Sequence, residues 1–136
     1  MTTDEWVSHL TNPEAVTTLF ESLPSLDWVG VTEISLEARG EVRLWIDLDA
    51  YPEDPPQRWE GNDRVNVELA LWGVTGRCIQ STGFLMELEG ELSIRGHGEE
   101  IEVSLDSDTD DSACRFICEE IYLERYTPYV AGANDC

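Results

Sequence analysis

Lysine is absent from this sequence, and basic side chains of any kind are few. The 136 residues include 29 acidic side chains against eight basic ones, all of them arginine, which gives a formal net charge of −21. A chain this acidic is repelled by the phosphates of nucleic acids and by anionic lipid surfaces. Binding to nucleic acid or to a membrane surface is therefore disfavoured as a function, and we expect the partners of this chain to be cationic.

Long apolar runs are missing as well. No stretch approaches the roughly 18 residues of a membrane-spanning helix, and the segment MTTDEWVSHL has no basic region ahead of an apolar one, as a secretory signal would. Leu, Ile, Val and Phe nevertheless make up 34 of the 136 residues, above the roughly 20% below which a highly charged chain stays unfolded. We expect a single folded domain over residues 1–136, located in the cytoplasm.

The four cysteines, Cys78, Cys114, Cys118 and Cys136, are too sparse for a disulfide framework. If residues 114–118 form a strand, Cys114 and Cys118 share one face about 13 Å apart, at a rise of about 3.3 Å per residue. A disulfide needs Cα atoms within about 7 Å. We therefore expect reduced thiols.

The first part of the chain, residues 3–23, has the pattern of two short helices. Thr2 and Glu5 have the spacing of a capping box, and Asn12 precedes Pro13 as an N-cap residue would. Apolar residues follow at helical spacing until Pro24 ends the second helix: Trp6, Val7 and Leu10, then Val16, Leu19, Phe20 and Leu23.

From residue 26 to 125 the apolar period changes to two, which predicts about seven strands in an antiparallel meander. The first strand is predicted from Thr32 to Ala38, with tight turns at Arg39-Gly40, Glu89-Gly90 and Gly96-His97-Gly98. A break of alternation at Glu119-Glu120 suggests a bulge. The expected fold is α+β and mostly antiparallel β, a curved sheet or open barrel with the helices packed on it, followed by a short tail over 127–136.

The residues that usually carry catalysis or metal binding are scarce. His9 and His97 are the only histidines, and neither lies in a pattern that a nucleophilic triad or a zinc site requires. Asp106, Asp108 and Asp110 copy three positions of a calcium-binding loop, but Asp111 stands where glycine is needed and Ile117 where glutamate should chelate. We expect no catalytic residues, no metal site, no cofactor and no enzymatic activity.

Aromatic residues occur in two unusual places. The long connection from Asp49 to Asp63 contains Tyr51 and Trp59, which either plug into the core at one end of the sheet or contact a partner. Trp45 and Trp72 fall on the polar side of their strands, where they are either covered by the helix carrying Leu19 and Phe20 or form part of a binding surface.

Several short segments together resemble immunity protein family 50 of bacterial polymorphic toxin systems, over roughly residues 6–95. They are Asn12-Pro13-Glu14-Ala15, Pro24-Ser25-Leu26, Val31-Thr32-Glu33-Ile34-Ser35-Leu36, Tyr51-Pro52, Pro55-Pro56, Trp59 and Asn66-Val67-Glu68-Leu69. The acidic segment 106–111 and the cysteines have no counterpart in this resemblance. It implies a mostly β fold and a non-enzymatic protein that binds and blocks a co-encoded toxin, and it supplies no catalytic residues.

The charge supports this implication, because an acidic domain suits the capture of a basic toxin by electrostatic steering. We expect an immunity protein that neutralises a cognate, cationic toxin domain by occlusion. From their chemistry, the candidate toxin-binding residues are Asp47, Asp49, Tyr51, Glu53, Asp54, Trp59, Trp45 and Trp72. The alternative is a non-catalytic β domain that binds a small molecule or a metal in the concavity of the sheet and at the acidic segment.

Overall fold

Eight antiparallel strands form one open sheet in the computed structural model, which describes residues 5–80, 88–107 and 113–130. The elements are α1 (Glu5–Ser8), α2 (Glu14–Thr17), β1 (Val29–Leu36), β2 (Val42–Leu48), a 3-10 turn η1 (Gln57–Trp59), β3 (Arg64–Trp72), β4 (Gly76–Gln80), β5 (Leu88–His97), β6 (Glu100–Ser107), β7 (Ala113–Cys118) and β8 (Glu120–Tyr129). The predicted fold class is confirmed, with eight strands where about seven were expected.

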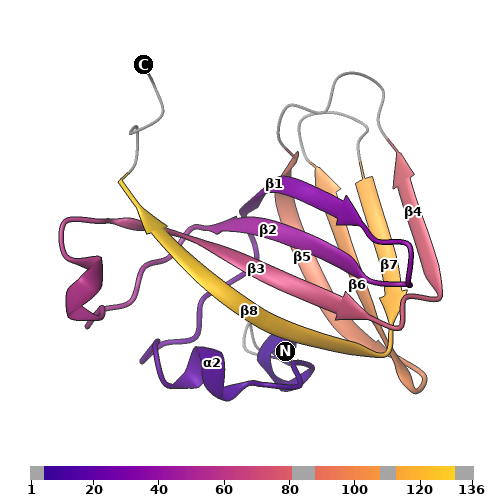
Figure 1. Ribbon diagram of the computed structural model, residues 1–136, viewed down its shortest axis with the longest axis horizontal. Coiled ribbons are helices and arrows are strands. Elements are labelled where there is room, and N and C mark those ends of the chain that lie inside the picture. Colours follow the sequence, from indigo (N-terminus) through magenta and orange to yellow (C-terminus); the bar gives the residue numbers. More distant parts are fainter. Residues whose placement is uncertain (1–4, 81–87, 108–112, 131–136) are drawn as a thin grey trace.

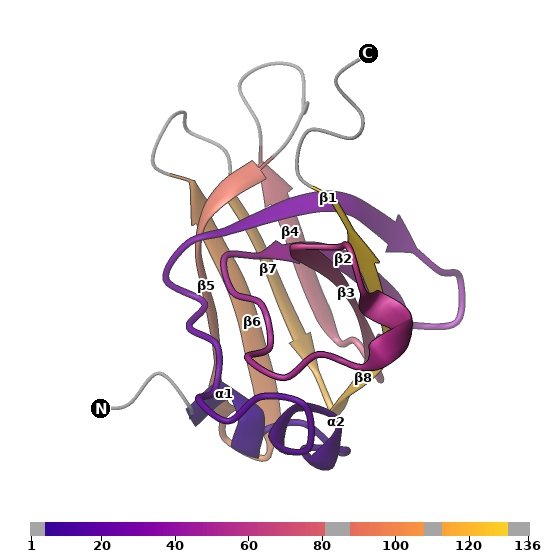
Figure 2. The same cartoon turned by 90° about the vertical axis from the view of Figure 1, so that its left-hand side faces the viewer.

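The sheet has the strand order β4-β7-β6-β5-β1-β2-β3-β8 and curves until its two halves face each other. In Figure 1, β1, β2, β3 and β8 pass in front of β5, β6 and β7. Figure 2 shows the sheet wrapping around the core, with α1 and α2 across the side that the sheet leaves open. The core therefore lies between the two halves and the helices.

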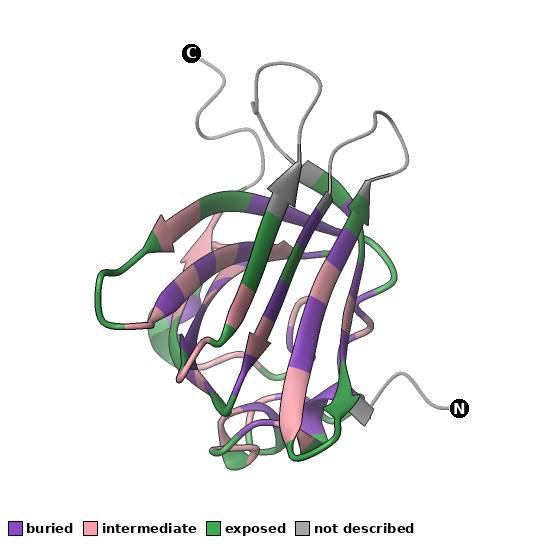
Figure 3. Ribbon diagram, turned by 90° about the vertical axis from the view of Figure 1, so that its right-hand side faces the viewer, coloured by how far each residue is buried: buried purple, intermediate pink, exposed green. Residues whose placement is uncertain are grey.

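Alternation of side chains along each strand divides the sheet into an inner and an outer face. In β2, Val42, Leu44, Ile46 and Leu48 are buried, whereas the residues between them are only half-buried. The same alternation of buried and exposed positions is visible in Figure 3. This is what a period of two predicts for strands with one face in the core. Cys114 and Cys118 are buried on β7 as free thiols.

The two helices are single turns, shorter than the pattern predicts, and they pack on the inner side of the sheet. Val16 and Phe20 enter the core, and the Tyr126 hydroxyl of β8 donates to the Ala15 carbonyl over 2.8 Å. Asn12 does not cap α2. Its side-chain amide donates to the Leu123 carbonyl over 2.9 Å and accepts from the Leu123 N–H over 3.0 Å.

Asn12 therefore acts as a substitute strand partner at the edge of the sheet. β8 is an edge strand, and an unpaired edge is a site of unwanted pairing with other chains. The Thr11 N–H adds a bond to the Ile121 carbonyl over 2.8 Å. This competing use of Asn12 explains why the capping prediction is wrong. None of the helices in the described ranges is long and apolar enough to span a membrane.

The predicted bulge at Glu119 is in fact a crossing point between the two halves of the sheet. Here β7 ends and β8 begins, alongside the connection from β3 to β4, and the Glu119 N–H donates to the Trp72 carbonyl over 2.9 Å. Gly73 has φ +65° and faces the Glu119 side chain so closely that a Cβ would collide with it. The observed bulge in β8 lies further on, opposite Glu68 and Leu69.

Two other boundaries differ from the prediction. The segment Glu89-Gly90 is not a turn, because β5 runs through it and Gly90 pairs with Val29 on one side and Ser107 on the other. The first strand begins earlier than predicted, at Val29, and an irregularity between Val31 and Glu33 shifts its alternation.

Candidate functional site

The connection between β2 and β3 is a packed loop, in agreement with the interpretation that Tyr51 and Trp59 plug into the core at one end of the sheet. Trp59 is 3% exposed, and its ring centroid lies 6.0 Å from that of Tyr51 and 5.8 Å from that of Tyr126. The Tyr51 hydroxyl donates to the Trp59 carbonyl over 3.3 Å. Trp59 thus supports the loop from inside the core, while Glu53 and Asp54 on the same loop are exposed.

Trp45 and Trp72 lie on the outer face of β2 and β3, on the opposite side of the sheet from the helices. Trp72 is 42% exposed and Trp45 is half-buried. The predicted cover by the helix carrying Leu19 and Phe20 is wrong, because α2 ends at Thr17 and both Val16 of α2 and Phe20 after it are buried in the core on the inner side of the sheet. A large indole on a polar, uncovered face is the signature of an interaction surface.

Asp47 and Asp49 lie at the far end of this same face, where they line a cleft of about 270 Å³. The other polar or aromatic residues of the cleft are Trp28, Arg64, Glu89 and Tyr129. Asn66 donates to Asp47 over 2.8 Å, and Arg64 lies 3.7 Å from Asp49 in a loose ion pair between exposed side chains. Trp28 is 39% exposed, so a second solvent-accessible indole stands beside these carboxylates.

At the other end of the outer face, Trp72 forms a hollow of about 330 Å³ with Glu120, Tyr122 and Glu124 of β8. The strand register brings them together, since Trp72 pairs with Glu120 and Ala70 with Tyr122, while the bulge adds Glu124. The Tyr122 hydroxyl lies 3.3 Å from a Glu120 carboxylate oxygen. Neither Glu120 nor Glu124 forms an ion pair within the described ranges.

Two cations lie between the cleft and the hollow: Arg43 of β2, which is already bound, and Arg125 of β8, which lies opposite Glu68 in the strand register and is exposed. Arg43 donates from Nε to Glu41 over 2.5 Å and from Nη1 to Glu68 on the neighbouring strand. The hydrogen bond to Glu68 is the main cause that raises the pKa of Arg43. We call this outer surface of β1, β2, β3 and β8 the aromatic–acidic face. It comprises Trp28, Trp45, Trp72, Tyr122 and Tyr129 with Glu33, Asp47, Asp49, Glu120 and Glu124.

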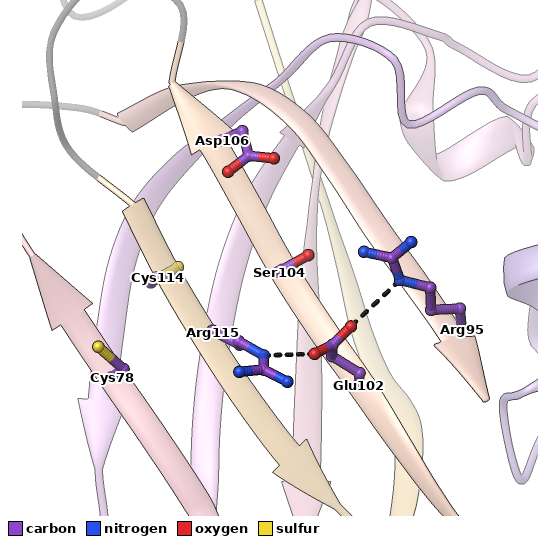
Figure 4. A pocket seen from close by; sticks show the side chains of 7 residues that line it. All are labelled: Cys78, Arg95, Glu102, Ser104, Asp106, Cys114 and Arg115. Atoms are coloured by element: carbon purple, nitrogen blue, oxygen red, sulfur yellow. Dashed lines mark hydrogen bonds and ion pairs between the residues drawn. The ribbon is translucent and has the colours of Figure 1, made fainter. Parts of the chain in front are cut away.

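The outer face of the other half of the sheet has a different character. Figure 4 shows Glu102 of β6 held between Arg95 of β5 and Arg115 of β7, in a pocket of about 340 Å³ that also includes Cys78 and Ser104. Glu102 is only 9% exposed, and the hydrogen bond from Arg115 lowers its pKa below the ordinary 4.5. Its charge is therefore matched locally by two guanidinium groups, and no indole lies among the residues that line this pocket.

The structure brings together Asp47, Asp49, Trp45 and Trp72 of the predicted residues on one face, and places Tyr51 and Trp59 inward. Sequence reasoning missed Trp28, Tyr122 and Tyr129. Alternation would have found Trp28 if the first strand had been started at Val29 instead of Thr32. Most of the acidic segment 106–111 lies outside the described residues, and within them no group of three or more His, Cys, Asp or Glu is arranged to hold a metal ion.

Comparison with known proteins gives one match. The family model described as Immunity protein 50 matches residues 12–129, which is most of the chain. None of the curated proteins and none of the solved structures gives a match.

Proposed function

The chain belongs to the Immunity protein 50 family, and from this premise we propose that it neutralises a cationic toxin protein by covering the toxin's functional surface with the aromatic–acidic face. Membership implies an immunity protein that binds a cognate toxin. The observation that supports the choice of this face is the presence of exposed indoles among carboxylates on the one side of the sheet that the helices leave open.

Charge supports a basic partner. With a net charge of −21, the chain attracts a cationic protein from a distance and raises its association rate. On the outer side of these strands Arg43 and Arg64 are engaged with carboxylates of the same face, which leaves Arg125 of β8 as the cation of β1, β2, β3 and β8 that has no ion pair among the described residues. Glu53 and Asp54, exposed on the adjoining loop, extend the negative surface beyond Asp49.

Apolar contact area supports affinity, which charge alone seldom supplies. Tryptophan and tyrosine dominate interface hot spots because each combines a large apolar surface with a polar tip. Trp28, Trp45 and Trp72 are spaced along this face, whereas Trp6 and Trp59 are buried in the core. Trp59 and Tyr51 contribute by fixing the loop that carries Glu53 and Asp54.

The proposal is tested by co-expressing this protein with the toxin encoded beside it, and by purifying the pair on gel filtration. We expect growth to be restored and a complex to elute. A double variant, Asp47→Asn with Asp49→Asn, should weaken the complex by about tenfold or more, since charge pairs across an interface are worth about 1.5 kcal/mol or more.

A matched control removes the same charge elsewhere. Glu91→Gln with Glu99→Gln neutralises two exposed carboxylates on β5 and in its turn to β6, remote from Asp47 in strand order. It should change the affinity by less than about threefold, through steering alone. Equal losses in both double variants would show that total charge and not this face determines binding, and the absence of any complex or protection would refute the function.

A further inference from the structure

Resting on the proposed function, we propose that the hollow beside Trp72 is a receptor for a single arginine side chain of the partner protein. The hollow combines an exposed indole, a phenol and two carboxylates contributed by neighbouring strands β3 and β8. The anchoring group of the toxin would then be an arginine side chain. It would bind at the end of the aromatic–acidic face away from Asp49.

The first step of the argument is the unmatched charge of the hollow. Glu120 and Glu124 have no ion-pair partner among the described residues, in contrast to Glu41 and Glu68, which share Arg43, and to Glu102, which has two arginines. The neighbouring Arg125 lies opposite Glu68 in the strand register and forms no ion pair with either of them. Two adjacent carboxylates without an ion-pair partner attract a cation from outside.

The second step is the shape and chemistry of the lining. A guanidinium is planar, stacks on an indole face by cation–π attraction, and can donate to more than one carboxylate oxygen at once. Trp72 is 42% exposed and so offers ring surface to such a group, with Glu120 directly opposite it in the strand register. An apolar side chain would leave both carboxylates desolvated without a partner.

A second copy of this chain is a poor occupant. It would bring another net charge of −21 to a surface that already has unmatched carboxylates. A segment of a cationic protein satisfies the same contacts and gains from steering. Charge complementarity therefore favours an arginine from a basic partner.

The inference can be tested without the toxin. We would titrate ¹⁵N-labelled protein with N-acetyl-arginine amide and follow the indole N–H signals, assigning that of Trp72 with a Trp72→Phe variant. N-acetyl-citrulline amide, which has nearly the same shape and no charge, is the matched probe. We expect saturable shifts centred on Trp72 with the arginine compound, and at least about fivefold weaker binding of the citrulline compound, from the cation–π and carboxylate contributions.

Two charge-neutralising variants complete the test. Glu120→Gln should weaken arginine binding by at least about threefold, whereas Glu91→Gln, with the same loss of charge on β5, should leave it unchanged. Equal binding of arginine and citrulline compounds, or shifts spread equally over the indoles of Trp28, Trp45 and Trp72, would overturn the assignment. Because this titration contains no toxin, its failure is distinct from a failure of the co-expression experiment, which concerns the proposed function.

Discussion

Substitution by alanine is predicted to lower mainly the stability of the protein at Trp59 and mainly its affinity for the toxin at Trp72. Trp59 is 3% exposed and packs against Tyr51 and Tyr126, so Trp59→Ala leaves a cavity and removes two ring contacts. Substitutions of this kind cost about 3–5 kcal/mol. Trp72 is 42% exposed on an open face, and Trp72→Ala should cost about 1.5 kcal/mol or less.

These costs translate into melting temperatures. For 136 residues the unfolding entropy is about 0.29 kcal/mol/K, from about 2.1 cal/mol/K per residue. Trp59→Ala should therefore lower the Tm by about 10–17 °C, and Trp72→Ala by less than about 5 °C. Differential scanning calorimetry, with far-UV circular dichroism to verify the fold, measures both.

Binding should show the reverse order. Measured well below both melting temperatures, toxin affinity should fall by about tenfold or more with Trp72→Ala, as expected for a hot-spot indole, and by much less with Trp59→Ala. A Tm decrease for Trp59→Ala below about 5 °C, or one equal to that of Trp72→Ala, would refute the division into a supporting and an exposed tryptophan.

Three further predictions concern thiols, pH and salt. Burial raises the pKa of Cys114 to about 11 and that of Cys118 to about 12. In a Cys136→Ser variant, only the exposed Cys78 should therefore react with a disulfide reagent at mildly alkaline pH until the protein is unfolded. Rapid reaction of more than one thiol in the folded state would contradict this. Because the folded pKa of Glu102 is lowered, the stabilisation from its charged form is present above about pH 4.5 and is lost as the pH falls through the folded value. Glu102→Gln should lower the free energy of unfolding by about 1–2 kcal/mol at neutral pH and by less in acid. Denaturant titrations in which the difference between the two proteins does not shrink in acid would count against this. The association rate with the toxin should fall with rising ionic strength, since exposed charges are screened over about 8 Å at physiological salt; a rate that is flat in stopped-flow measurements would assign the acidity to solubility.

The fold was largely predictable because a period of two in apolar residues directly reflects a half-buried strand. Val42 to Leu48 shows this most clearly, since its alternation in sequence and its burial coincide. The errors arose where tertiary contacts override local signals. Asn12 has the chemistry of a cap but is bound by Leu123, which lies 111 positions away. Gly90 has the chemistry of a turn but lies between two strands.

The candidate site was predictable only in part, for the same reason. Trp45 and Trp72 could be placed on a polar face from alternation alone. Whether another element covers that face depends on the length and direction of α2, which local pattern does not encode. Predicting the hollow from the sequence would have required the pairing of β3 with β8, although β4, β5, β6 and β7 lie between these two strands in the chain. It would also have required the bulge in β8 that adds Glu124 to the lining.

The absence of lysine has a physical counterpart at the two places where the structure concentrates charge. Arg43 binds Glu41 through Nε and Glu68 through Nη1, so one planar group serves carboxylates on two strands. Arg115 and Arg95 each direct Nε to a different oxygen of Glu102. An ammonium group is a point charge on a flexible stem and does not present this fixed fork. Arginine thus matches carboxylates in the middle of each outer face, whereas Glu120 and Glu124 beside Trp72 have no ion pair among the described residues.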